Sequence, residues 1–185
     1  MLNFMYVAQA LLVLVLVWAV YAFNRCIRNR NLVREAWSGV DVQLKRRHDL
    51  VPQLVECVKG YRDHEAALLE NVALARSRAR AVYDIGEVRT AENALTQELR
   101  SLIAVVEAYP DLKAGANFRQ LMTSLVEIED QLQYARRYYN GTVRDFNIVV
   151  ESFPGILLAK LAGFHAAAFF EIESSVERQV PEVKL

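Results

Sequence analysis

An uninterrupted run of uncharged residues, 4–23, most constrains how this chain can fold, and Gln9 is its only strongly polar member. About 20 residues at a rise of 1.5 Å each cross the roughly 30 Å hydrocarbon core of a bilayer as one helix. Tyr6 lies near one end of the run, and Trp18 and Tyr21 lie near the other. Aromatic side chains favour both membrane–water interfaces. The run therefore predicts a transmembrane helix over residues 4–23.

Basic residues follow this run and predict its orientation. They are Arg25, Arg28, Arg30 and Arg34, whereas the segment before the run contains no lysine or arginine. Because positively charged flanks remain cytoplasmic, the N-terminus should lie outside the cell membrane and the following chain in the cytoplasm. A cleaved secretory signal is the alternative. The missing basic n-region and an apolar run longer than about 7–15 residues favour a permanent single-pass anchor.

Beyond the anchor, apolar residues recur at alternating spacings of four and three. The series is Val33, Trp37, Val40, Leu44, Arg47, Val51, Leu54, Val58, Tyr61, Glu65, Leu68, Val72, Ala75, Ala79 and Val82. Only Arg47 and Glu65 interrupt this apolar seam. A period of about 3.5 residues is typical of helices that pack at shallow angles in coiled coils and bundles. The phase survives Pro52, which we interpret as a kink rather than a helix end.

The phase also survives Gly60 and favours one continuous helix over residues 33–82. Gly60 as a C-cap and Asp63 as the next N-cap would instead make a tight corner, and this alternative stays open. A continuous helix would leave the membrane-proximal seam, residues 33–58, without full cover from the shorter helices that follow. A corner would close a four-segment bundle and remove this argument for oligomers.

An uncovered apolar stripe of that length does not stay in water. We therefore expect the membrane-proximal seam to meet a second copy of the chain, another membrane protein or the C-terminal segment. The candidate interaction residues are Val33, Trp37, Val40, Leu44 and Arg47.

Two further apolar stripes predict two more long helices. The second stripe is Val88, Ala91, Leu95, Leu99, Leu102, Val106 and Tyr109. The third is Phe118, Leu121, Leu125, Ile128, Leu132, Ala135, Tyr139, Thr142, Phe146, Val149 and Phe153. Pro110 should end the second helix, and Asn117 with Gln120 matches a capping box at the start of the third. Pro154 opens a last apolar segment that should be buried or touch lipid.

These patterns predict an all-α fold. An N-terminal single-pass transmembrane helix continues into a long-helix antiparallel (up-down) cytoplasmic bundle. The predicted division is a transmembrane helix at 4–23, a helical bundle at 24–172 and a polar C-terminal tail at 173–185.

Arg47 is the most informative polar residue, because it falls within the apolar seam. It could snorkel or pair with an acid on a neighbouring helix, and Glu129 and Asp145 are the conceivable partners. His48 and Asp49 are adjacent, so their side chains diverge by about 100° on a helix and make a poor catalytic pair. An enzyme site would need His48 to converge with Asp145 or Arg47 between helices.

Other chemistry has little support in the sequence. Basic and acidic residues number 22 each, so net charge does not indicate nucleic acid as a partner. The stretch HEAAL lacks the second histidine of a zinc-binding helix, and no phosphate loop or Cys/His cluster occurs. We expect no catalytic, metal or cofactor site and no small-molecule substrate. Cys26 and Cys57 suggest no disulfide framework, although Cys26 lies where acylation is reachable.

Four separated stretches carry a family resemblance. They are RNRNLVREAWSGVDVQLKRRHDLVPQLVECVKGY, EAYPDLKAGANF, ARRYYNGTVRDFN and FPGILLAKLAGF, in that order between about Arg28 and Glu171. Together they resemble the LemA family. The resemblance implies an N-terminal membrane helix with a cytoplasmic α-helical bundle, and no established enzymatic activity.

The most economical function is assembly or scaffolding at the lipid bilayer through helix–helix contacts. The partner would be a second copy or another membrane protein. A regulatory or adaptor subunit of a membrane enzyme such as a protease is the alternative, and an enzyme with a site between the bundle helices is a remote one.

Overall fold

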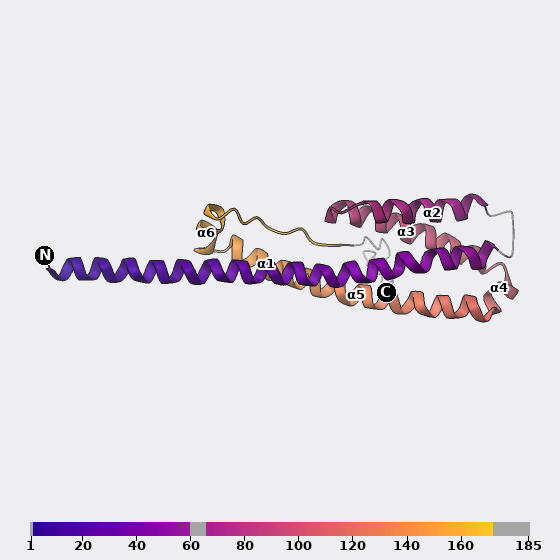
Figure 1. The fold of residues 1–185 in the computed structure, drawn as a ribbon, viewed down its shortest axis with the longest axis horizontal. Coiled ribbons are helices and arrows are strands. Elements are labelled where there is room, and N and C mark those ends of the chain that lie inside the picture. Colours follow the sequence, from indigo (N-terminus) through magenta and orange to yellow (C-terminus); the bar gives the residue numbers. More distant parts are fainter. Residues whose placement is uncertain (1, 60–65, 172–185) are drawn as a thin grey trace, which may run out of the picture. The chain divides into compact units, whose positions relative to one another are not determined.

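The computed structural model describes residues 2–59 and 66–171, which are helical over most of their length (Figure 1). The helices are α1 (Leu2–Lys59), α2 (Ala66–Ala81), α3 (Ile85–Val106), α4 (Pro110–Ala114), α5 (Ala116–Glu151) and α6 (Gly155–Leu161). No strand occurs within these described ranges. The N-terminal helix is long and apolar enough to cross a membrane. The all-α prediction is confirmed, and the predicted tail at 173–185 lies outside the described residues.

The described chain divides into two compact units. The first contains residues 2–40 and 137–169, and the second contains residues 41–136 with Phe170 and Glu171. The two long helices, α1 and α5, each contribute residues to both units.

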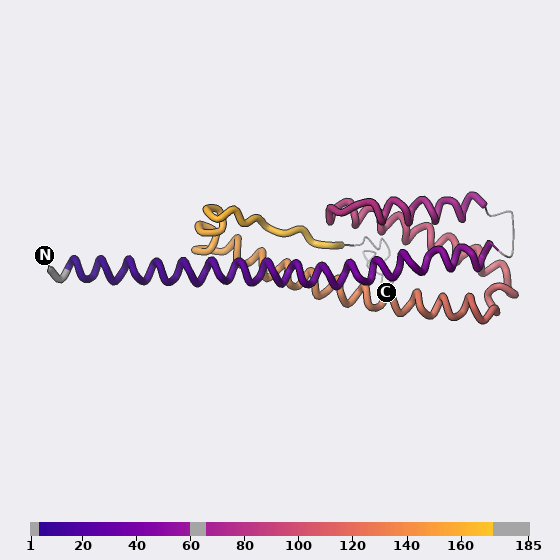
Figure 2. Tube along the Cα trace, in the orientation of Figure 1, coloured from indigo at the N-terminus to yellow at the C-terminus, as the bar shows by residue number. Residues whose placement is uncertain are grey.

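The second unit has one apolar core to which five helices contribute. Its buried members are Leu50, Val51, Leu54 and Val58 of α1, Leu69, Val72, Ala75 and Ala79 of α2, Leu95, Leu99, Leu102 and Val106 of α3, Leu112 of α4, and Phe118, Leu125 and Ile128 of α5. The Cα trace in Figure 2 shows α2 and α3 lying side by side. Removal of these apolar side chains from water is the main force that holds the helices together.

The favoured prediction of one continuous helix over residues 33–82 is wrong. Helix α1 ends at Lys59, and α2 returns beside it. The Nε of Arg76 donates a hydrogen bond to the backbone oxygen of His48 at 2.6 Å. In a continuous helix these two residues would lie about 42 Å apart along the axis. Gly60 and Asp63, the residues of the alternative corner, lie outside the described residues.

The heptad phase misled because both helices face the same core. Val51 and Leu54 of α1 and Val72 and Ala75 of α2 are buried in one cluster, so the apolar series continues in phase across the reversal. Periodicity reports which face of each helix is buried, but it does not report whether the chain turns between them. Pro52 does not end the helix, as interpreted, since α1 runs through it.

The turn between the first apolar seam and the second apolar stripe ends in a helix cap. Asp84 is the N-cap of α3, and its Oδ1 accepts hydrogen bonds from the backbone N–H of Gly86 at 2.9 Å and of Glu87 at 3.3 Å. Pro110 begins the short helix α4. Helix α5 begins at Ala116, so Asn117 lies in its first turn and is not the predicted N-cap.

The first unit packs the middle of α1 against the end of α5 and against α6. Its buried cluster contains Cys26 of α1, Phe146 and Val150 of α5, Ala159 of α6 and Phe164 after α6. The apolar segment after Pro154 is helical only from Gly155 to Leu161. Gly163 then takes the left-handed conformation (φ 70°) that favours glycine.

Residues 164–169 return along α5 without regular secondary structure. The Asn147 side chain holds this return by donating to the backbone oxygen of Ala167 at 3.0 Å and accepting from its N–H at 2.8 Å. The Tyr139 hydroxyl donates to the backbone oxygen of Ala168 at 2.8 Å. Burial raises the pKa of Tyr139 to about 12, which keeps this phenol protonated as a donor.

Leu102→Ala should test the core of the second unit. Leu102 is 1% exposed, so truncation leaves a cavity and should lower the free energy of unfolding by about 2–5 kcal/mol. Chemical denaturation of the full chain in detergent, followed by circular dichroism, measures the change. Leu74→Ala is the matched control, since Leu74 is 48% exposed. Equal losses for the two variants would contradict the assigned core.

Candidate functional site

A buried polar cluster lies within the second unit, centred on Arg47 of α1. Arg47 is 1% exposed. Its Nη1 donates to Oε2 of Glu92 at 3.0 Å, and its Nη2 donates to Oγ1 of Thr96 at 2.9 Å. Its Nε lies 2.8 Å from Oε1 of Glu129. The guanidinium therefore joins α1 to α3 through two hydrogen bonds and to α5 through an ion pair, in which the Nε itself makes no hydrogen bond.

Glu92 is the acidic centre of the cluster and is 0% exposed. Its second oxygen, Oε1, lies 2.6 Å from Nε2 of His48, which also belongs to α1. An ionised carboxylate only accepts hydrogen bonds, so the proton of this contact resides on Nε2 when Glu92 is charged. The Thr96 hydroxyl donates its proton to the backbone oxygen of Glu92 at 2.8 Å. The lone pairs of the Thr96 hydroxyl oxygen therefore remain available to accept the hydrogen bond from Arg47.

Glu129 closes the cluster on the side of α5 and is only partly buried. Burial is the main cause that raises the pKa of Glu129, and the nearby Arg47 guanidinium opposes that shift. The Glu92 carboxylate, a like charge, raises it further. One guanidinium thus faces two carboxylates.

The structure bears out some of the predicted partners of Arg47 and not others. Glu129 pairs with it, as one of the two sequence candidates, whereas Asp145 is exposed and lies 3.4 Å from Arg144. His48 is buried and Asp49 is exposed, so the adjacent pair diverges as predicted.

Sequence reasoning missed Glu92, although a signal was present. Glu92 lies four residues after Val88 and three before Leu95, so it occupies a seam position of the second apolar stripe. A carboxylate at such a position is costly unless it is paired. Its coincidence with Arg47, a cation in the first seam, could have suggested the pair.

The candidate interaction residues are less exposed than the sequence predicted. Val40, Leu44 and Arg47 are buried, and Val33 and Trp37 are partly buried. The ring of Trp37 packs edge-on against Tyr139 of α5 at a centroid distance of 5.2 Å. The expectation of an uncovered seam at residues 33–58 is therefore wrong for most of its length. Helix α5 and the segment from α6 onward pack against Val33 and Trp37, and α2 and α3 cover the seam near Lys59.

The cluster has the geometry of a structural contact. Both Arg47 and His48 are buried, so a substrate has no access to their polar atoms. Among the described residues, no group of three or more His, Cys, Asp or Glu side chains could hold a metal ion. A buried charge pair of this kind fixes which helices meet and in what register, and removing one partner is strongly destabilising.

Cys26, the thiol that the sequence placed within reach of acylation, is buried beneath Phe146 and Phe164. Burial raises the pKa of Cys26, and the neighbouring Arg25 opposes the shift. A buried thiol with a raised pKa is a poor nucleophile.

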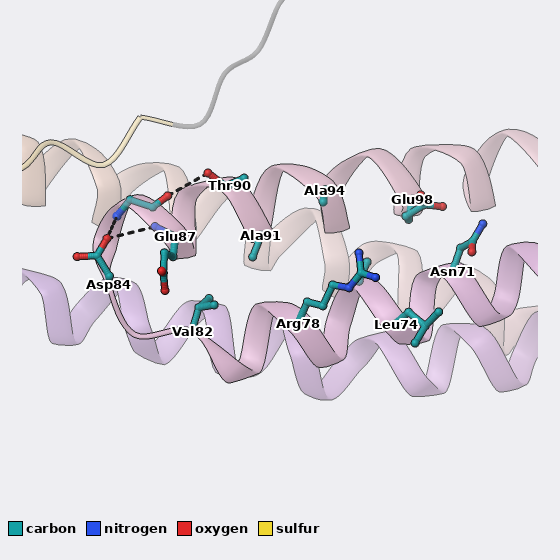
Figure 3. A pocket seen from close by; sticks show the side chains of 12 residues that line it. Asn71, Leu74, Arg78, Val82, Asp84, Glu87, Thr90, Ala91, Ala94 and Glu98 are labelled. Carbon is teal, nitrogen blue, oxygen red and sulfur yellow. Dashed lines mark hydrogen bonds between the residues drawn. The ribbon is translucent and has the colours of Figure 1, made fainter.

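An open groove lies between α2 and α3 (Figure 3). Its volume is about 770 Å³. Small side chains contribute much of its lining, namely Ala75 of α2 and Ala91 and Ala94 of α3. Such residues let another helix approach closely.

Charged residues line the same groove and give it an acidic balance. The acidic residues of the described lining are Asp84, Glu87 and Glu98, and its basic residue is Arg78. Asp84 also caps α3, which fixes its carboxylate at one end of the groove (Figure 3). An acidic groove of this kind attracts positively charged ligands.

A long apolar helix, a helical bundle and a buried structural charge cluster define a membrane-associated helical protein. The chain belongs to the LemA family, whose sequence model matches residues 36–185.

Curated relatives fall into two groups. Magnetosome protein MamQ 2 of Paramagnetospirillum magneticum is 36% identical over 81 residues, which make up 44% of this chain and 30% of that protein. Magnetosome protein MamQ of Magnetospirillum gryphiswaldense is 30% identical over 80 residues, 43% of this chain and 29% of the relative. Protein LemA of Metamycoplasma hominis is 26% identical over 159 residues, 84% of this chain and 71% of the relative. The match thus spans less than a third of the MamQ proteins.

Arg47→Met should lower the free energy of unfolding by about 3–5 kcal/mol, because Glu92 is left buried without its cation. Adding Glu92→Leu to Arg47→Met should recover much of this loss. Lys45→Met is the matched control two residues away. It removes an exposed pair with Asp41 at 2.6 Å, for which we expect a loss below about 1 kcal/mol. Denaturant unfolding of the full chain measures all three variants, and similar losses for both single variants would refute the structural role of the cluster.

Glu129 should make stability depend on pH. Its pKa in the folded chain is raised above the ordinary value of 4.5, so the folded state holds this proton more tightly than the unfolded state. The resulting stabilisation is complete below the ordinary pKa and is lost as the pH rises through the raised pKa. Glu129→Gln cannot ionise, so its stability relative to the native chain should improve as the pH rises from about 4 to 7. Unfolding curves that stay parallel across this range would contradict the assignment.

Proposed function

We propose that this protein is a membrane-anchored helical scaffold that binds a helical segment of another membrane-associated protein in the groove between α2 and α3. The anchor is the apolar run at 4–23, with the N-terminus outside and the bundle in the cytoplasm. The positive flank that supports this orientation contains Arg25, Arg28, Arg30 and Arg34.

The groove is the observation that carries the proposal. Alanines on both of its helices leave room between α2 and α3 for the side chains of a further helix. Helix-in-groove binding uses an amphipathic helix whose apolar residues recur every three or four positions. The acidic balance of Glu87, Glu98 and Asp84 against Arg78 favours a partner with lysine or arginine beside that apolar stripe.

The family adds a consistent context. The curated relatives include proteins named for the magnetosome, and the match to them covers less than a third of their length. These relatives therefore support only the general idea of a membrane-associated role. No reactive group of this chain is needed for it.

A second copy of the chain is the competing partner. Val33 and Trp37 are the two candidate interaction residues that keep part of their surface exposed, so they stay candidates for self-association. The groove experiment below distinguishes the two partners.

Photocrosslinking in the cells that make the protein tests the groove. A photoreactive benzoylphenylalanine at Ala94 should form one main adduct with another membrane-associated protein. Mass spectrometry should place the attachment site on a helix with an apolar stripe and flanking basic residues. The same photoreactive residue at Gln97, which is exposed on α3 outside the groove, is the matched control and should give no such adduct.

Charge reversal completes the test. Glu87→Lys with Glu98→Lys should lower the Ala94 adduct by about tenfold, because the basic partner now meets like charge. The helical circular dichroism signal should be unchanged, since Glu87 is exposed and Glu98 is outside the apolar core. An adduct that is equal at Gln97, or insensitive to the charge reversal, would refute the groove as a docking site. An adduct between two copies would replace the proposed partner with self-assembly.

A further inference from the structure

The corner between α5 and α6 carries three large apolar side chains on its surface. Phe153 is 81% exposed, Leu157 is 57% exposed and Leu161 is 88% exposed. Leu157 and Leu161 are four residues apart on α6, so they lie on one face of the helix. We refer to these three residues as the apolar corner.

The apolar corner belongs to the first unit and lies against the part of α1 near the end of the apolar run. A small cavity is lined on one side by Trp18, Tyr21 and Arg25 of α1, and on the other by Phe153 and Gly155. The corner therefore lies at the same level along α1 as the end of the predicted transmembrane run. Figure 1 shows α6 beside this part of α1.

Aromatic packing fixes that position. The ring of Phe164, just after α6, contacts Phe23 of α1 at a centroid distance of 5.8 Å, and Phe146 of α5 at 6.5 Å. The guanidinium of Arg30 lies 5.2 Å from the centroid of the Phe164 ring. These contacts tie the segment just after α6 to Phe23, the last residue of the apolar run, and to Arg30 beyond it.

Backbone packing restrains the corner as well. A Cβ on Gly155 would lie 2.6 Å from the backbone oxygen of Val149, so only glycine lets α6 begin this close to α5. The N–H of Ile156 donates to the backbone oxygen of Ser152 at 2.9 Å. The exposed side chains therefore sit on a defined turn.

We propose that the apolar corner is a second membrane contact, in which Phe153, Leu157 and Leu161 enter the interfacial layer of the bilayer beside the end of the transmembrane helix. The inference requires the membrane anchor and does not depend on the α2–α3 groove. Short amphipathic elements bind this layer by burying apolar side chains about 5–10 Å below the headgroups.

The aromatic and basic side chains around the apolar corner are of types that favour the interfacial layer. Trp18 and Tyr21 are of the types enriched at membrane interfaces, and Arg25 is of the type that interacts with lipid phosphates. Lys160 is exposed on α6 between Leu157 and Leu161, where its long side chain can reach the headgroups while its methylenes lie among acyl chains. Continuity with the anchor and this basic, aromatic surround favour lipid over a protein partner.

A depth measurement tests the proposal on the full chain. Single cysteines at Leu157 and Leu161, in a background of Cys57→Ser with the buried Cys26 retained, are labelled with an environment-sensitive nitrobenzoxadiazole dye. The protein is reconstituted in vesicles of phosphatidylcholine with a minority of phosphatidylglycerol. Quenching is compared between lipids with a doxyl group near the top of the acyl chain and iodide in the water.

At Leu157 and Leu161 we expect doxyl lipid to quench the dye and iodide quenching to fall roughly threefold relative to Val126, because iodide is excluded from the interfacial layer. Val126 is the matched control, an exposed apolar residue of the second unit. Full access of iodide to Leu157 and Leu161 would refute the proposal.

Two further arms separate the possible failures. A dye at Val13, within the apolar run, reports the anchor itself. Quenching by doxyl lipid at Val13 without quenching at Leu157 would overturn the second contact while the anchor stands. Nanodiscs that hold one copy of the chain distinguish lipid from a second copy. A dye that is covered by a neighbouring chain becomes accessible to iodide when that chain is absent, and this result would also overturn the proposal.

Discussion

The buried guanidinium of Arg47 is the constraint on which the arrangement of the second unit depends. A cation at a seam position cannot remain in an apolar core without acceptors, because desolvation of an unpaired charge costs several kcal/mol or more. Glu92 and Thr96 of α3 accept hydrogen bonds from the guanidinium, and Glu129 of α5 pairs with it as a second negative charge. Apolar seams by themselves do not select one register of these helices, whereas the charge of Arg47 is compensated only where these partners converge.

How much of the fold could be predicted from the sequence follows from what helical periodicity reports. It identified the buried faces of α1, α2, α3 and α5, and Pro110 and Pro154 marked the breaks that follow α3 and α5. It could not identify the reversal between α1 and α2, because Val51 and Val72 face one core in the same phase. When the apolar series of two helices share one phase, only tertiary contacts show whether the chain reverses between them. The hydrogen bond from Arg76 to the His48 carbonyl is such a contact.

The candidate site likewise contains residues that could be identified from the sequence and residues that could not. Arg47 could be singled out from the sequence because a charge within an apolar seam needs a partner, and Glu129 was one of two reasonable choices. Glu92 was hidden, since a glutamate on an amphipathic helix is ordinarily solvated. The predicted contacts Val40 and Leu44 are buried, because the exposure of a seam depends on whether a later helix covers it, which is again a property of topology.

The two proposed surfaces differ in how long they can remain empty. The groove between α2 and α3 carries four charged side chains beside its alanines, Leu74 and Val82, so part of its lining is well solvated when the groove is empty. The apolar corner exposes one phenylalanine and two leucines, and each such side chain gains about 1.5–3 kcal/mol from full burial. A surface with that driving force, held beside a membrane helix, is suited to permanent occupancy by lipid. The groove has a partly charged lining, so it is suited to a partner that binds reversibly.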